Sequence, residues 1–172
     1  MNRLIQAIAF AADKHRNQRR KDADASPYIN HPIALANVLA NEAGVDEEAV
    51  LIAAVLHDTI EDTDTTASEL ESVFGEEIAA IVLEVTDDKR LPKGERKRLQ
   101  IEHAPTISRS AKLVKLADKI CNLRDVADSS PVQWSLERRQ EYFEWAKAVV
   151  DGLRGVHPRL EALFDRAYAN KP

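Results

Sequence analysis

The sequence predicts an all-α fold, and three observations support this prediction. The chain has 172 residues, which is enough for one well-formed core and too few for two ordinary domains. It contains only 5 glycines, whereas residues that favour helices (alanine, leucine, glutamate, lysine and arginine) are abundant. No segment alternates apolar and polar residues in the way that is typical of a half-buried strand. We therefore expect one helical domain over residues 1–172.

Helix-start and helix-stop residues place the elements of the first half. Residues 2–17 carry apolar side chains at helical spacing. A second helix opens near Pro32, a suitable first helical residue, and stops at Gly44. Asp46 can cap a third, apolar helix that ends near Asp62.

Capping boxes and a proline mark the later helix starts. Thr66 with Glu69, and Ser130 with Gln133, have the spacing of a capping box, and Pro158 suits the first turn of the last helix. The expected helices span residues 2–17, 32–44, 46–62, 66–75, 76–85, 95–103, 109–127, 131–151 and 158–169, with a charged loop at 86–94.

Charge and cysteine content limit the partners and the compartment. The net charge is −5, so we expect no nucleic-acid partner. Clustered cations on an acidic protein suit a small polyanion, although solvated helix surface explains each cluster equally well. A lone cysteine, Cys121, excludes an intramolecular disulfide and is expected in the core. Without a signal peptide or a membrane-spanning stretch, we expect a cytoplasmic protein with no membrane partner, and the oligomeric state stays open. The basic clusters are Arg16 to Lys21, Lys89 to Arg98, and Lys112, Lys115 and Lys119.

The most informative feature is an apolar helix that runs directly into His57, Asp58, Glu61 and Asp62. At about 100° per residue these four side chains share an arc of about 140° on one helix face. If buried, the three carboxylates would repel one another and lose hydration, and a bound cation removes that objection. We therefore predict a metal site for Mn²⁺, Fe²⁺ or Zn²⁺, which tolerate mixed histidine and carboxylate ligands.

Further ligands must come from elsewhere in the chain. His31 starts a helix after a loop, although a His-Pro pair is by itself an ordinary helix start. Asp118 is the second candidate, and helical spacing places Lys115 and Asn122 on the same side of its helix. A surface ion pair between Asp118 and Lys115 is the alternative.

Taken in order, these motifs resemble the HD-domain metal-dependent phosphohydrolases. More narrowly, they resemble the hydrolase domain of RelA/SpoT-type alarmone enzymes, and above all the free-standing small alarmone hydrolases, including the animal-type members. The resemblance covers roughly residues 5–155. Adjacent histidine and aspartate alone are weak evidence, whereas the ordered set is specific. The matching segments are Arg20–Lys21, Tyr28–Pro32, Leu56–Asp64, Thr86–Lys89, Arg96–Leu99, Lys115–Arg124 and Gln140–Trp145.

The resemblance implies a site as well as an HD-domain helical bundle. It assigns Glu61 and Asp62 to catalysis, where carboxylates beside a metal-activated water can orient that water and accept its proton. A role limited to fixing His57 is the alternative for these two acids. One Mn²⁺ per chain is implied, with the ligands His31, His57, Asp58 and Asp118.

The implied substrate is guanosine with a 5′-diphosphate or 5′-triphosphate and a 3′-diphosphate, which leaves as pyrophosphate to give GDP or GTP. Exposure on a charged surface is the alternative for the helix cations, and core packing is the alternative for the tyrosine. The expected substrate contacts are Arg20 and Lys21 to the 3′-diphosphate, Lys93, Arg96 and Lys97 to the 5′-diphosphate, Asn122 to ribose or phosphate, and Tyr142 to sugar or base.

Other functions remain open at this point. The first alternative is an enzyme of the same fold with another substrate, which hydrolyses adenosine alarmones or removes the 2′-phosphate of NADPH. Product analysis separates these options, because the alarmones release pyrophosphate and NADPH releases orthophosphate. A nucleotide-sensing HD module without turnover is disfavoured by the presence of Glu61 and Asp62. A structural or nucleic-acid-binding helical protein does not account for the acids at 57–62. Since the longer alarmone enzymes carry a synthetase domain for which this chain has no length, we expect hydrolysis only.

Overall fold

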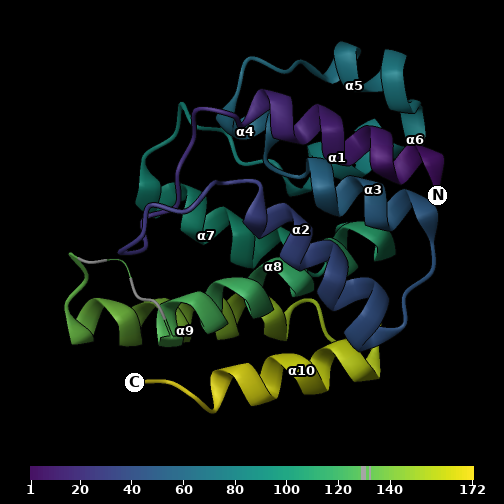
Figure 1. Cartoon of the computed structure of the whole chain (residues 1–172). Helices are drawn as coiled ribbons and strands as arrows, with labels where there is room; N and C mark the ends of the chain where they lie inside the picture. Colours follow the sequence, from purple (N-terminus) through teal and green to yellow (C-terminus); the bar gives the residue numbers. More distant parts are fainter. Residues whose placement is uncertain (129–130, 132) are drawn as a thin grey trace.

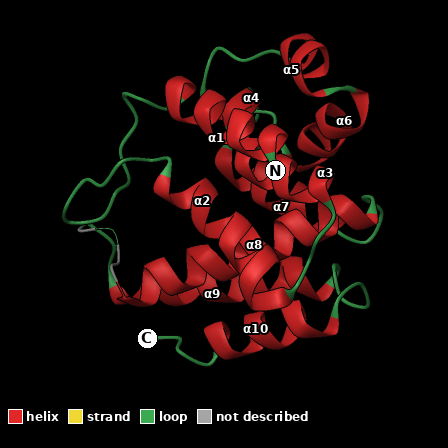
Figure 2. Cartoon of the chain, turned by 45° about the vertical axis from the view of Figure 1, so that its right-hand side comes forward, coloured by secondary structure: helices red, strands yellow, loops and turns green. Residues whose placement is uncertain are grey.

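The computed structural model describes residues 1–128, 131 and 133–172, and all regular secondary structure within these residues is helical (Figures 1 and 2). The predicted fold class is therefore confirmed. No helix in the described part of the chain has the length and apolarity to cross a membrane. The elements are α1 (Asn2–Lys14), α2 (Asn30–Asn37), the π-helix η1 (Val38–Ala43), α3 (Glu48–Leu56), α4 (Thr59–Asp62), α5 (Ala67–Phe74), α6 (Glu76–Val85), α7 (Lys93–His103), α8 (Arg109–Asp128), α9 (Leu136–Asp151) and α10 (Pro158–Tyr168).

Two buried helices, α3 and α8, form the centre of the bundle. Helix α3 is apolar around most of its circumference because α1, α2, α6 and α8 all pack against it. Helix α8 contacts α2, α3, α6, α9 and α10. Figure 1 shows α10 and α9 along one side of the molecule and α5 with α6 at the opposite side. Side chains from α2, α3 and α8 therefore face one another in the interior.

A break between α3 and α4 places the ionisable residues. Helix α3 ends at Leu56, and α4 begins at Thr59, so the predicted continuous helix to Asp62 is wrong. The hydroxyl of Thr59 donates a hydrogen bond to the carbonyl oxygen of Leu56 at 2.7 Å, which satisfies a terminal acceptor of α3. Between the two helices, Asp58 has φ −100° and ψ 0°. His57 and Asp58 are consequently presented from a turn rather than from a regular helix face.

The expected ends of the first helices are partly correct. Gly44 ends η1 with a left-handed φ of 81°, as predicted. Helix α1 stops at Lys14, before residue 17. Asp46 does not cap α3, which begins at Glu48 without a side-chain cap.

The start of α9 differs most from the prediction. The predicted capping residue Ser130 lies outside the described residues, and residues 131 and 133–135 are not helical. Ser135 caps α9 instead, because its hydroxyl accepts the backbone N–H of Arg138 at 3.2 Å. By contrast, Thr66 caps α5 and Pro158 opens α10, as expected.

Gly152 after α9 gives a test of the packing. A Cβ at this position would lie 2.9 Å from Cβ of Ala104 and 3.1 Å from Cδ of Pro105. Since its φ of −78° suits any residue, contact alone decides the outcome. We expect Gly152→Ala to lower the free energy of unfolding by about 1–3 kcal/mol. Gly94→Ala, whose Cβ would meet no described atom within 4 Å, should raise it by about 0.5–1 kcal/mol. Denaturant titration of both variants checks this, and equal shifts would contradict it.

An ion pair between η1 and α8 gives a pH-dependent contribution to stability. The guanidinium of Arg124 donates two hydrogen bonds to Glu42, at 2.9 and 2.8 Å, and these lower the pKa of Glu42. The stabilisation is fully present above the unfolded pKa of 4.5 and is lost as the pH falls further. After allowance for solvent screening, we expect Glu42→Gln to cost about 0.5–1 kcal/mol at pH 7 and less at pH 3. Urea titrations at both pH values check this, with Glu71→Gln on α5 as the control, and a cost that is the same at both would refute it.

Candidate metal centre

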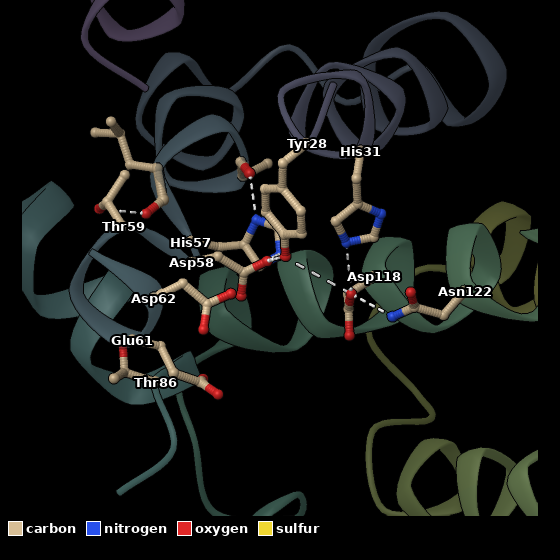
Figure 3. A network of polar contacts seen from close by, with 12 residues as sticks. Tyr28, His31, His57, Asp58, Thr59, Glu61, Asp62, Thr86, Asp118 and Asn122 are labelled. Carbon is tan, nitrogen blue, oxygen red and sulfur yellow. Dashed lines mark hydrogen bonds and ion pairs between the residues drawn. The ribbon is translucent and has the colours of Figure 1, made fainter. Parts of the chain in front are cut away.

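Three side chains from distant parts of the chain meet in one buried cluster. His31 lies in the first turn of α2, His57 follows α3, and Asp118 belongs to α8 (Figure 3). Their ligand atoms all lie within 4.8 Å of one another. Nε2 of His31 lies 3.2 Å, and Nε2 of His57 lies 3.9 Å, from Oδ1 of Asp118. The structure therefore confirms the prediction that side chains from these three distant stretches of the chain lie close together.

Asp58, the fourth expected ligand, borders this cluster. Its Oδ2 lies 2.8 Å from Nε2 of His57 and also accepts a hydrogen bond from the hydroxyl of Tyr28. The sequence indicated Tyr28 only as part of a motif and gave it no function. Its position three residues before His31, at the entry to the same helix, was the signal that places it near the site.

The ring of His57 is oriented by its own helix. Nδ1 donates a hydrogen bond to the carbonyl oxygen of Ala54 at 2.8 Å, so Nε2 is the atom that faces the cluster. Within the described residues, this buried Nε2 has carboxylate oxygens of Asp58 and Asp118 beside it, at 2.8 and 3.9 Å, but forms no well-aligned hydrogen bond. A buried ring nitrogen of this kind beside two carboxylates forms a donor set that fits a divalent cation.

Opposite charges make the cluster compatible with burial. Burial by itself would lower the pKa of His57, but Asp58 and Asp118 outweigh it and raise this pKa to about 9. Burial would raise the pKa of Asp58, yet His57 holds it below its usual range. The pKa of Asp118 is likewise held low, against burial, mainly by Lys119. The carboxylates are thus anionic, as metal ligands must be.

Glu61 projects from α4 beside the cluster (Figure 3). Burial raises its pKa to about 7, although the backbone N–H of Asp87 donates a hydrogen bond of 3.1 Å to Oε2. The guanidinium of Arg96 lies 3.9 Å from Oε1. A carboxyl group with a pKa near neutrality is suited to proton transfer at physiological pH. Arg96, which was expected to bind the 5′-diphosphate together with Lys93 and Lys97, faces Glu61 instead and does not line the cavity that those two lysines line.

Asp62 is held through both of its carboxylate oxygens. Oδ2 accepts a hydrogen bond of 3.1 Å from Nε2 of Gln18, and Oδ1 pairs with the ammonium of Lys89. The sequence pattern predicts neither partner. Because the carbonyl of Ala54 already fixes His57, nothing in this geometry favours the alternative in which the two acids only orient that ring.

A chain of cavities leads outward from the cluster. The cavity at the cluster has a volume of about 200 Å³ and adjoins one of about 670 Å³, which in turn adjoins one of about 570 Å³. Neighbouring cavities share lining residues. Each expected substrate residue other than Arg96 lines at least one of them: Arg20 and Asn122 the first and second, Lys21 and Tyr142 the second and third, and Lys93 and Lys97 the third.

Several of the residues that line these cavities already have partners within the protein. Nδ2 of Asn122 donates a hydrogen bond of 2.6 Å to Oδ1 of Asp118, which ties it to the cluster. Arg20 forms an ion pair with Asp125. Asp118 pairs with Lys119 at 3.0 Å, so the alternative of an ion pair with Lys115 is wrong.

An aromatic surface formed by Trp134 and Tyr142 lines the outer cavities. The rings of Trp134 and Trp145 lie 5.5 and 5.3 Å from that of Tyr142, and the guanidinium of Arg138 lies 4.4 Å from the ring of Trp134. Trp134 and Arg138 are not among the site residues that the sequence predicts. Their four-residue spacing in a segment expected to be helical was the available signal. Tyr142 therefore lines a cavity and also packs against the hydrophobic core.

An all-helical bundle with a buried histidine–aspartate cluster defines a metal-binding helical domain. Comparison with known families agrees with this class, because the family model described as "HD domain" matches residues 7–143. The protein therefore belongs to the HD-domain family, as its sequence motifs predicted.

Two proteins and one solved structure are similar to this chain over nearly its whole length. The chain is 59% identical to "Guanosine-3′,5′-bis(diphosphate) 3′-pyrophosphohydrolase MESH1" of Homo sapiens over 168 residues, which is 98% of this chain and 94% of that protein. The protein of the same name from Xenopus tropicalis is 55% identical, with coverage of 98% and 94%. A solved structure described as "A metazoan ortholog of SpoT hydrolyzes ppGpp and plays a role in starvation responses" superposes with a TM-score of 0.94 at 50% identity and covers 96% of this chain and 93% of its own.

Tyr28 provides a test of the geometry around Asp58. We expect Tyr28→Phe to weaken divalent-metal affinity by about tenfold, because the carboxylate loses the hydroxyl that orients it. Tyr168→Phe, which removes a hydroxyl bonded to the exposed Glu144, is the matched control and should leave the affinity unchanged. Calorimetric titration with a divalent metal measures both, and equal affinities of the two variants would contradict the assignment.

Proposed function

We propose that the protein is a hydrolase that removes the 3′-pyrophosphate of guanosine 3′,5′-bis(diphosphate), and of the corresponding pentaphosphate, to give GDP or GTP. The observation that carries this proposal is the buried His31–His57–Asp118 cluster, which lies beside two carboxylates and opens toward basic cavities. The MESH1 proteins named above, at 55% and 59% identity over nearly the whole chain, support the same substrate.

The proposed cofactor is one Mn²⁺ per chain, held by His31, His57, Asp58 and Asp118. Two imidazoles with two carboxylates form a mixed nitrogen and oxygen set that suits Mn²⁺. When bound, the ion supplies the positive charge that activates water near neutral pH and neutralises phosphate oxygens. The buried Nε2 of His57, which faces both carboxylates, and the anionic state of both aspartates support this assignment.

Glu61 and Asp62 provide the proton chemistry in this proposal. Water attacks the phosphorus that is bonded to O3′, the P–O3′ bond breaks, and the departing O3′ takes up a proton. Glu61, with a pKa of about 7, accepts a proton from the attacking water and returns one to O3′. Asp62, held between Gln18 and Lys89, orients the water.

Positive side chains along the cavities bind the two diphosphates. Arg20 and Lys21 line the cavity next to the cluster and bind the 3′-diphosphate, and Lys93 with Lys97 binds the 5′-diphosphate. For Arg20 this requires exchange of its ion pair with Asp125 for a phosphate. Positioning and charge neutralisation of this kind account for most of the catalysis of phosphoryl transfer.

The nucleoside lies between these two anion sites in our proposal. Asn122 is fixed by Asp118 at the inner end and can hydrogen-bond ribose or phosphate. Tyr142 presents its ring to sugar or base within the aromatic surface that it forms with Trp134. We also infer that the single HD-type domain extends over residues 1–172, and that the free, buried thiol of Cys121 fits action in the reducing cytoplasm.

A substrate panel with Mn²⁺ tests the function. We expect release of pyrophosphate and GDP from guanosine 3′,5′-bis(diphosphate), resolved by chromatography. Orthophosphate from NADPH alone, or turnover of adenosine alarmones alone, would replace this substrate assignment. Tight binding of the guanosine alarmone without product would instead favour a nucleotide sensor.

The division between metal ligands and catalytic acids is separately testable. We expect Asp62→Ala to lower kcat by at least about 10²-fold while metal content stays near one per chain, since Asp62 lies outside the ligand cluster. His57→Ala should lose both the metal and some thermal stability. Elemental analysis of the dialysed proteins decides the matter, and equal metal content in the two variants would refute the division of roles.

A further inference from the structure

Gln18 connects a buried histidine to the carboxylate of Asp62. Its Nε2 donates a hydrogen bond of 3.1 Å to Oδ2 of Asp62, and its Oε1 lies 2.7 Å from Nδ1 of His15. His15 directly follows α1 and is only 2% exposed. Its ring packs against that of Tyr28, with centroids 4.9 Å apart. A continuous chain of hydrogen bonds therefore leads from the protein interior to Asp62.

The chemistry of the three groups fixes the direction of this chain. The Asp62 carboxylate, which is also paired with the ammonium of Lys89, can only accept hydrogen bonds, so the amide nitrogen of Gln18 faces it. The amide oxygen of Gln18 then faces His15, and because this oxygen can also only accept, Nδ1 of His15 must carry the proton.

Packing does not explain a histidine at this position. Nε2 of His15 is buried and has no hydrogen-bond partner in the part of the chain that the structure describes. An unpaired buried polar atom is destabilising, and an apolar side chain of similar volume would avoid that cost. What the histidine provides and an apolar residue does not is the Nδ1–H donor to Gln18.

The two oxygens of Asp62 are held in different ways. Oδ1 pairs with Lys89, whose side chain is 50% exposed and lies at the cavity wall. Oδ2 is held by Gln18, which is anchored in turn by the buried ring of His15. The inner oxygen is thus fixed by the fold itself, while the outer oxygen depends on a solvent-exposed cation. Catalytic groups need this kind of support, because small displacements cost large factors in rate.

We infer that His15 is a positioning residue for the hydrolysis, acting through Gln18 to hold the carboxylate of Asp62 in its working orientation. This inference rests on the catalytic role proposed above for Asp62. His15 touches neither the substrate nor the metal cluster in this assignment. Its effect should therefore appear in kcat rather than in KM or metal content.

Steady-state kinetics of the Mn²⁺-loaded full chain with guanosine 3′,5′-bis(diphosphate) test the inference. We expect His15→Leu to lower kcat by about tenfold or more, with KM and metal content unchanged and the unfolding midpoint at or above the wild-type value. His15→Asn, which retains an N–H near the position of Nδ1 and lacks Nε2, should recover most of the lost kcat. His103→Leu, at an exposed histidine of α7, is the control.

A double-mutant cycle keeps the inference falsifiable if His15→Leu folds poorly. Gln18→Leu alters a partly exposed side chain and should lower kcat as much as His15→Leu. The double variant should lose no more than Gln18→Leu alone, because both changes interrupt one path. Additive losses, an unchanged kcat in either single variant, or a loss of kcat that follows metal content would overturn the inference.

The same measurements separate the two proposals. A wild-type protein that does not hydrolyse the alarmone overturns the proposed function and this inference with it. An active wild type whose kcat is indifferent to His15→Leu and Gln18→Leu overturns only the positioning role.

Discussion

The structure depends on burying two carboxylates and two imidazoles at the point where α2, α3 and α8 meet. Neither a carboxylate nor a protonated imidazole is stable alone at that depth, because each charged group would lose its hydration without compensation. Together they compensate one another, as the low pKa of Asp118 and the raised pKa of His57 indicate. The break after α3 fits this arrangement, since it turns the His57–Asp58 pair toward the two helices that carry His31 and Asp118.

The segment between α1 and α2 acts as one wall of the site. It is held in place by an isolated bridge between Arg19 and Pro27 and by a hydrogen bond of 3.1 Å from the backbone N–H of Tyr28 to the carbonyl oxygen of Gln18. From this wall Tyr28 reaches Asp58 and Gln18 reaches Asp62. A loop without regular secondary structure thereby positions both the proposed metal ligand Asp58 and the proposed catalytic acid Asp62.

The distribution of charge reconciles a net charge of −5 with a polyanionic substrate. The acids at the centre are neutralised locally, by histidines and by the buried Lys119. The cations that remain line the outer cavities, where burial and then neighbouring cations, Arg138 among them, lower the pKa of both Lys93 and Lys97. The field that a diphosphate meets on entry is therefore positive, although the protein as a whole is acidic.

The sequence by itself determined the helical class, most helix positions and the residue types of the site, because helical periodicity, caps and ligand chemistry are local properties. Only the tertiary structure decided how these residues are arranged. The break at His57 depends on packing against other helices, which a helix wheel ignores. The contacts of Asp62 with Gln18 and Lys89 span 44 and 27 residues, and no spacing rule encodes them. Local patterns name the groups that a site needs, whereas their distances and partners arise from the packing of segments far apart in the chain.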